Sequence, residues 1–171
     1  MKKIAILGPE STGKTSLSQA LAEHYNARWI PEYAREYVGQ LTRPYTYADV
    51  EAIAQYQIQE FAAIDKENVG GFVFLDTELI ITKIWFLHCY GTCPRYLLEA
   101  IEQSDVDLYI LCRPDIPWQP DPLRENEQLR DYFYEIYKQE IIALQKPFIE
   151  LSGIDSERKE NAVKAITEFF S

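Results

Sequence analysis

The sequence predicts an α/β fold in which helices cover both faces of a five-stranded parallel sheet. Short apolar runs alternate with longer helical patterns along the 171 residues, and this alternation is typical of parallel sheets. The run at residues 72–75, FVFL, also lacks alternating polar residues, as strands buried on both faces do. With 47% hydrophobic residues, a chain of this length is expected to form one domain over residues 1–171.

The expected strands are five apolar runs bounded by turn residues. Pro31 ends the second run, because proline cannot continue a central ladder. Gly70 and Gly71 precede the third run, FVFL, and Asp76 ends it. The five runs span residues 4–7, 27–30, 72–75, 107–112 and 147–151.

The segments between the strands have apolar residues at three- and four-residue spacing, which indicates helices. The helix that opens at Tyr45 illustrates this spacing with Val50, Ile53, Ala54 and Gln57. Helices are expected from residue 16 to about 25, over 33–41, from 45 to about 68, up to about 90, over 94–103, from 126 to about 145, and up to about 170.

Residues 113–124, RPDIPWQPDPLR, are predicted to form a lid. Four prolines exclude a regular helix or a ladder strand. A tryptophan and two arginines argue against a simple spacer. The segment follows the fourth predicted strand, so it leaves the sheet at the edge where ligands bind in open parallel folds.

The loop after the first strand reads GPESTGKT and matches the pattern G-x-x-x-x-G-K-[ST]. In such loops the backbone N–H groups surround phosphates, the lysine reaches the β- and γ-oxygens, and the last hydroxyl binds Mg²⁺. A chance match in a turn is disfavoured, since a strand precedes the loop and a helix follows. The sequence therefore predicts ATP and Mg²⁺ as cofactors, with GTP as an alternative donor. The nucleotide-binding residues expected in the loop are Gly8, Glu10, Ser11, Thr12, Gly13, Lys14, Thr15 and Ser16.

The net charge of −10 argues against nucleic acid as a partner, because phosphate backbones need a concentrated basic surface. No apolar stretch approaches a membrane span or a secretory signal. The chain is therefore expected to be soluble and cytoplasmic and to act on a small molecule. Its oligomeric state stays open.

Two carboxylates follow predicted strands and are expected at the site. Asp76 occupies the place of a Mg²⁺-holding carboxylate, with a helix cap as the alternative. Glu32 is placed to bind ribose hydroxyls or to accept the proton of an attacking one; its alternative is a charge at a helix N-terminus. Either carboxylate could be the catalytic base. Together with Lys14 and Arg124, they form the expected catalytic set.

Arginines and aromatic residues complete the expected site. Arg113 and Arg124 flank the lid, where guanidinium groups can close over a transferring phosphoryl group. Arg35 could contact phosphate or pair with a neighbouring glutamate. A flat base would stack on aromatic faces, and a cationic ring would gain most from them. The residues expected on the substrate are Glu32, Tyr33, Arg35, Tyr56, Asp76, Trp85 and Trp118.

Four segments together resemble the ribosylnicotinamide kinase domain of NadR-type proteins. They are GPESTGKT, EYARE at residues 32–36, FLDTE at 74–78 and PWQPDPLR at 117–124. The first is common among nucleotide-binding proteins, whereas the second and fourth are much more restrictive. The resemblance extends over nearly the whole chain and implies a kinase-like three-layer fold of the P-loop class.

The resemblance also implies an activity: ATP-dependent phosphorylation of the ribose 5′-hydroxyl of nicotinamide riboside, a salvage step toward NAD. On that basis Lys14 and Thr15 serve phosphate and Mg²⁺, Glu32 and Asp76 serve acceptor and metal, and Arg124 belongs to the lid.

The chain departs from the family pattern in three ways. The family often has tryptophan before E-Y-x-R, where this chain has Pro31, and glycine in the lid, where it has Pro122. The further domains that often precede the kinase are not expected, because the first strand follows Met1 so closely.

Two other functions remain as alternatives. One is a kinase for another nucleoside or nucleotide. The other is a nucleotide-dependent switch or regulatory ATPase. The sequence has no N-K-x-D or LSGGQ motif, and it is short for an AAA module.

Overall fold

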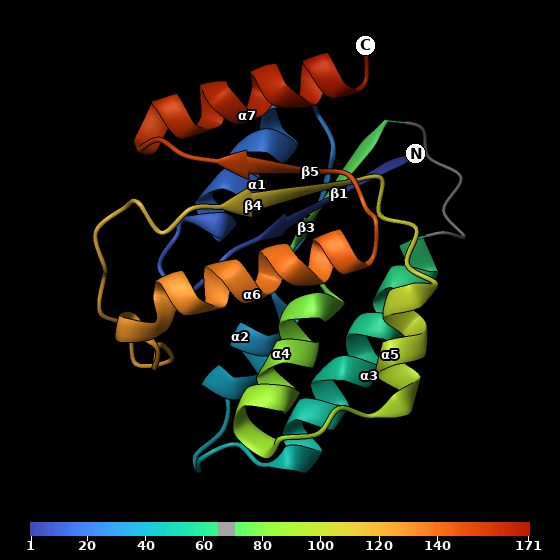
Figure 1. The fold of residues 1–171 in the computed structure, drawn as a ribbon, viewed down its shortest axis with the longest axis vertical. Helices are drawn as coiled ribbons and strands as arrows, with labels where there is room; N and C mark the ends of the chain where they lie inside the picture. The colour runs from blue at the N-terminus through green and yellow to red at the C-terminus, as the bar shows by residue number, and fades with distance from the viewer. Residues whose placement is uncertain (65–70) are drawn as a thin grey trace.

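The fold was analysed in a computed structural model that describes residues 1–64 and 71–171. Five parallel strands form one sheet in the order β2-β3-β1-β4-β5 (Figure 1). The predicted α/β fold is thus confirmed, and β1 lies at the centre. The strands are β1 Lys2–Leu7, β2 Arg28–Ile30, β3 Phe72–Asp76, β4 Leu108–Cys112 and β5 Phe148–Leu151.

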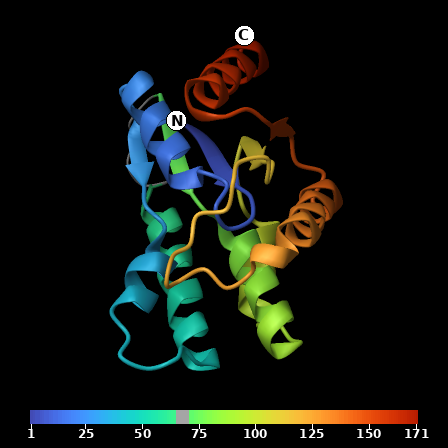
Figure 2. The same ribbon diagram turned by 90° about the vertical axis from the view of Figure 1, so that its left-hand side faces the viewer.

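Helices cover both faces of the sheet (Figure 2). On one face, α1 and α7 pack against Ile4 and Ile6 of β1. On the other, α3, α4 and α6 pack against Ala5 and Leu7 of the same strand, with α5 beside α3 and α4. Successive residues of β1 therefore enter opposite cores, because side chains alternate across a strand. The helices are α1 Lys14–His24, α2 Tyr33–Gly39, α3 Tyr47–Ile64, α4 Leu79–Tyr90, α5 Arg95–Glu102, α6 Arg130–Ala143 and α7 Asp155–Phe169.

Two predicted helices begin later in the structure than the sequence indicated. The helix expected from Tyr45 begins at Tyr47, because the carboxylate of Asp49 accepts hydrogen bonds from the backbone N–H and hydroxyl of Thr46 and fixes a turn there. Its expected end near residue 68 lies outside the described residues. The helix expected from Asn126 opens as a 3-10 turn, Glu127–Leu129, before α6.

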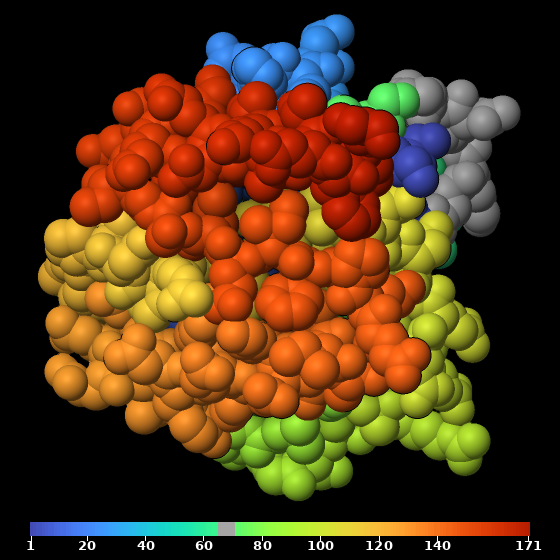
Figure 3. Space-filling view, turned by 45° about the horizontal axis from the view of Figure 1, so that its top comes forward, coloured from blue at the N-terminus to red at the C-terminus, as the bar shows by residue number. Residues whose placement is uncertain are grey.

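The lid segment connects β4 to α6. At its base it contacts helices from both faces of the sheet. In the space-filling view, it lies beside the side chains of α6 and α7 (Figure 3). Arg130 of α6 donates to the carbonyl of Ile116, and Arg158 of α7 pairs with Asp115. Within the described residues, no helix is both long and apolar enough to cross a membrane.

Glu78 is fully buried at the N-terminus of α4, where its carboxylate accepts a hydrogen bond of 3.0 Å from the N–H of Ile80. Burial raises the pKa of Glu78 to about 7. The unfolded chain therefore loses this proton at lower pH than the folded protein does. The contribution of Glu78 to the free energy of unfolding is therefore expected to fall as pH rises from about 4.5 to about 7 and to stay constant at higher pH.

Glu78→Gln should remove that pH dependence, because glutamine keeps an acceptor but does not titrate. We expect the stability of the variant relative to wild type to rise by roughly 3 kcal/mol between pH 4 and pH 8. Urea unfolding at both pH values measures this difference. Glu23→Gln, at an exposed carboxylate of α1, is the matched control. Parallel pH profiles for wild type and Glu78→Gln would contradict the assignment.

Candidate active site

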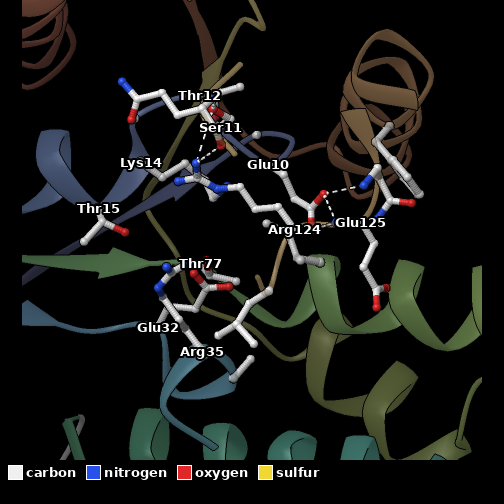
Figure 4. Close-up of a pocket in the computed structure, with 18 of the residues that line it drawn as sticks. Glu10, Ser11, Thr12, Lys14, Thr15, Glu32, Arg35, Thr77, Arg124 and Glu125 are labelled. Carbon is white, nitrogen blue, oxygen red and sulfur yellow. Dashed lines mark hydrogen bonds between the residues drawn. The ribbon is translucent and has the colours of Figure 1, made fainter. Parts of the chain in front are cut away.

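A cavity of about 1010 Å³ opens at the carboxyl ends of the strands. The loop after β1, the start of α2, α4 and the lid all line it (Figure 4). This is the edge at which ligands bind in open parallel sheets. The structure thus brings together the loop, Glu32, Arg35, Trp85 and Arg124 around one space.

The loop after β1 adopts a conformation that depends on its glycines. Gly8 has φ 149°, and a Cβ there would lie 2.8 Å from the carbonyl oxygen of Cys112. Gly13 has φ 73° and directly precedes α1. The first N–H groups of α1 therefore face the loop, as anion binding requires. Lys14 donates a hydrogen bond of 2.8 Å to the carbonyl of Pro9, which holds its amine over the loop.

Glu32 lies at the cavity surface, across from the loop (Figure 4). Burial raises the pKa of its carboxyl group, while the positive charge of Lys14 opposes that shift and the charge of Asp76 adds to it. Arg35 and Arg124 also favour the charged form. The cationic groups keep a carboxylate charged, and poor solvation raises its affinity for a proton. A carboxylate in such a place is suited to accept a proton.

Asp76 is only 2% exposed and lies behind Thr77, which lines the cavity. Neither of its carboxylate oxygens accepts a well-aligned hydrogen bond from the described residues, although the hydroxyl of Thr15 lies close by. Burial raises the pKa of Asp76, and the hydroxyl of Thr15 and the charge of Lys14 oppose that shift. Buried carboxylate oxygens are normally paired or bound to a cation. The oxygens of Asp76 beside the hydroxyl of Thr15 therefore fit a Mg²⁺ ion, whose preferred ligands are oxygens.

The end of the lid is held against the phosphate loop. The hydroxyl of Ser11 accepts a hydrogen bond of 2.9 Å from the N–H of Gln119 and lies 3.5 Å from the guanidinium of Arg124. The guanidinium groups of Arg124 and Arg130 lie about 6 Å from the ring of Trp118. Arg124, at the end of the predicted lid, therefore carries its charge beside the phosphate loop.

Glu10 directs its carboxylate toward the lid. The carboxylate accepts hydrogen bonds from the N–H groups of Glu125 and Asn126, at 3.1 and 2.8 Å for the same oxygen (Figure 4). Its expected role in nucleotide binding stays a prediction that rests on its place in the loop.

Arg158 is a buried residue beside the site that the sequence did not indicate. It is 4% exposed and donates hydrogen bonds to the carbonyls of Thr12 and Gly153 at 2.7 Å. It also donates to the carbonyl of Arg113 and pairs with Asp115. One buried guanidinium thus ties the phosphate loop to the base of the lid. No local motif marks this residue, because its partners lie far along the chain.

Several expected ligand residues lie outside the lining of the cavity. Arg113 pairs with Glu150 and lies 5.4 Å from the ring of Tyr134. The rings of Tyr33 and Tyr56 stack on each other, with their centroids 3.7 Å apart. Trp118 packs under two arginines instead of facing the cavity. The residues expected at the site but not among those lining it are Tyr33, Tyr56, Asp76, Arg113 and Trp118.

Four of the residues that line the cavity form an aromatic wall, defined here as Tyr45, Trp85, Phe133 and Tyr137. Tyr45 meets Trp85 edge to face, with ring centroids 4.9 Å apart. Of these four residues, only Trp85 belonged to the expected substrate-binding set, although Tyr45 was one of several aromatic residues expected near the acceptor. Phe133 and Tyr137 were not expected, because their positions depend on how α6 packs against α4.

Among the described residues, the ion pair of Arg35 is with the lid and not with a neighbouring glutamate. Its guanidinium forms an ion pair with Asp121 of the lid, from an exposed position at the rim of the cavity. Asp121 also accepts a hydrogen bond of 2.9 Å from the N–H of Leu123. This pair connects the start of α2 to the lid, whose chain runs between α2 and α6 (Figure 2).

A phosphate loop after the central strand, facing Glu32 at the end of β2 and lying under a lid, is the arrangement of a P-loop nucleotide-binding domain. The fold and the site assign this chain to that class. The chain belongs to the AAA domain family, whose model matches residues 3–159. The expectation that the chain is too short for an AAA module is therefore wrong.

The chain is similar to NadR, described as a trifunctional NAD biosynthesis and regulator protein. It is 30% identical to NadR of Salmonella typhimurium and to NadR of Escherichia coli over 130 residues, or 72% of this chain. The chain spans about a third of the length of these curated relatives, since the match covers 31% of each. The resemblance found in the sequence motifs is thus confirmed.

Solved structures show the same fold. A crystal structure of NadR in complex with NR superposes with a TM-score of 0.81 and 25% identity, over 98% of this chain and 51% of that chain. Deoxyadenosine kinase from M. mycoides superposes at 0.69 with 13% identity, over 97% of this chain and 99% of that chain. The latter similarity supports the kinase-like fold alone.

Proposed function

We propose that the protein phosphorylates the ribose 5′-hydroxyl of nicotinamide riboside, using ATP, to give nicotinamide mononucleotide. The similarity to the NadR structure in complex with NR, over 98% of this chain, carries this proposal. The joined cavity supports it, because phosphoryl transfer needs the donor loop and the acceptor site in one enclosed space.

In the proposed reaction, the 5′-oxygen attacks the γ-phosphorus of ATP as the bond from that phosphorus to the β-γ bridging oxygen breaks. Glu32 accepts the proton of the hydroxyl. We assign this role to Glu32 because its carboxylate lines the cavity, whereas the carboxylate of Asp76 is buried behind it. Lys14 and Arg124 balance the negative charge on the transferring group.

The donor set fits a Mg²⁺ ion at Asp76 and Thr15. When bound, Mg²⁺ neutralises charge on the β- and γ-phosphates. The two unpartnered oxygens of Asp76 support this placement. The remaining work belongs to the chain's own residues: Lys14 and the N–H groups of the loop orient the phosphates, and the lid excludes water.

The aromatic wall is proposed to hold the nicotinamide ring. The ring of nicotinamide riboside carries a positive charge, which electron-rich aromatic faces attract. The carboxylate of Glu125 lies beside this wall, accepting a hydrogen bond of 3.1 Å from the hydroxyl of Tyr45. A neutral base would gain less from these groups.

Phosphoryl transfer can be tested by measuring ADP release and phosphorylated product for a panel of acceptors. The panel contains nicotinamide riboside, thymidine, uridine and nucleoside monophosphates. We expect nicotinamide riboside to have the highest kcat/KM. Equal or greater activity on another acceptor would instead support a kinase for that compound.

The matching family is described as an AAA domain. This description favours a second candidate function, that of a nucleotide-dependent regulatory ATPase. That function predicts rapid ATP hydrolysis without any acceptor and no stimulation by nicotinamide riboside. The same panel, run with an acceptor-free reaction, separates the two. The aromatic wall of the cavity favours a kinase, because hydrolysis alone needs no second ligand space.

A further inference from the structure

A carboxylate within a phosphate-binding loop needs a physical explanation. Its negative charge would repel the phosphates if it faced them. Glu10 avoids this, because its carboxylate accepts hydrogen bonds from the N–H groups of Glu125 and Asn126 in the lid end, defined as residues 124–126. Hydrogen bonds from backbone N–H groups to a carboxylate are strong ones.

The lid end is also held from the acceptor side. The side chain of Glu125 accepts a hydrogen bond of 3.1 Å from the hydroxyl of Tyr45. Tyr45 packs edge to face on Trp85 and lies 3.7 Å from the sulfur of Cys89. One residue of the lid therefore connects to the phosphate loop through its backbone and to the aromatic wall through its side chain.

We propose that Glu10 and Tyr45 are positioning residues that hold the lid end between the phosphate loop and the aromatic wall, so that closure over the nucleotide and closure over the acceptor occur together. This inference rests on the proposed function only for the identity of the acceptor. Arg124 lies in the same three residues, so the same contacts fix its guanidinium near Ser11. Joint closure limits the access of water to ATP when the acceptor is bound.

Amide hydrogen exchange tests the contacts without any acceptor. In wild type the N–H groups of Glu125 and Asn126 donate to Glu10 and should exchange slowly. Glu10→Ala should speed their exchange at least about tenfold, since a hydrogen bond to a charged group is lost. Glu10→Gln keeps an acceptor oxygen and should restore part of the protection. Glu127→Gln, on an exposed carboxylate just beyond the lid end, is the control. Unchanged exchange in Glu10→Ala would overturn the proposal.

Kinetics test the coupling. Glu10→Ala should lower kcat/KM for the acceptor about tenfold and raise the ratio of ADP formed to product phosphorylated. Tyr45→Phe keeps the ring but removes the hydroxyl, and it should change the same ratio in the same direction. The double variant should lose less than the two single losses combined, because both residues hold one segment. A change confined to the KM for ATP would overturn the proposal.

The two proposals fail in distinguishable ways. If wild type does not phosphorylate nicotinamide riboside, the proposed function fails, and the acceptor that the panel identifies is used in the kinetic test. If Glu10→Ala does not fold, Tyr45→Phe decides, since it removes one hydroxyl from the wall. Fully additive losses in the double variant would show that the lid end does not couple the two sides.

Discussion

Lys14→Ala is expected to lower kcat for phosphoryl transfer about a thousandfold, the largest loss of any single change to the site. The amine is held over the loop by its hydrogen bond to Pro9, where a triphosphate would bind. Its charge also lowers the pKa values of Glu32 and Asp76. Removing it therefore weakens charge balance on the phosphates and favours protonation of both carboxyl groups. Steady-state transfer kinetics measure the loss.

Lys164→Ala is the matched control for this change. Lys164 is an exposed lysine of α7 whose nearest acidic partner, Glu168, lies 3.9 Å away, and its removal should leave kcat unchanged. Circular dichroism should show that the Lys14→Ala variant keeps its fold, because the side chain is partly exposed and its amine bonds to the carbonyl of Pro9 in the loop. Wild-type activity in Lys14→Ala would show that the loop does not bind the transferred phosphate.

Glu32→Gln is expected to lower kcat about a hundred- to a thousandfold, with little change in the affinity for ATP. Glutamine has nearly the same shape but cannot accept the proton of the 5′-hydroxyl. The pKa of Glu32 is raised by burial, so wild-type kcat should fall on the acid side at a higher pH than an ordinary glutamate would give. That acid limb should be absent from the pH profile of the variant.

The variant should be at least as stable as wild type. A carboxyl group whose pKa is raised by folding destabilises the folded state above the unfolded pKa, and glutamine removes that cost. Thermal unfolding at pH 7 measures this effect. Glu36→Gln, an exposed carboxylate one turn further along α2, is the control for kinetics. Loss of ATP affinity alone in Glu32→Gln would place this residue on the donor side.

Local chemistry was enough to predict the sheet, the phosphate loop and the two strand-end carboxylates. The run FVFL is apolar throughout because β3 is buried on both faces, and Asp76 ends it. The glycines of the loop were predictable because their backbone angles and close approaches exclude most side chains. Such features depend on neighbours in the sequence, so the sequence displays them directly.

Features that depend on packing between distant segments could not be predicted in this way. Glu10 meets Asn126 across 116 positions, and Arg158 meets Thr12 across 146. Arg113 was expected to contact phosphate, but Glu150 of the neighbouring strand lies within reach of its guanidinium. The strand order, which places β4 beside β5, decides that contact. No spacing of residues along the chain encodes it.

The central position of β1 has a consequence for how such a protein can change over evolution. Glu32, Tyr45 and Trp85, which are proposed to hold the acceptor, follow β2 and β3 on one side of β1, whereas the lid and the wall residues Phe133 and Tyr137 follow β4 on the other. Neighbouring strands lie only about 5 Å apart, so donor and acceptor groups stay in reach while belonging to separate segments. Substitutions in the acceptor segments can therefore alter the substrate while the donor apparatus is inherited unchanged. The fold shared with deoxyadenosine kinase at 13% identity shows that this scaffold persists while most of the sequence changes.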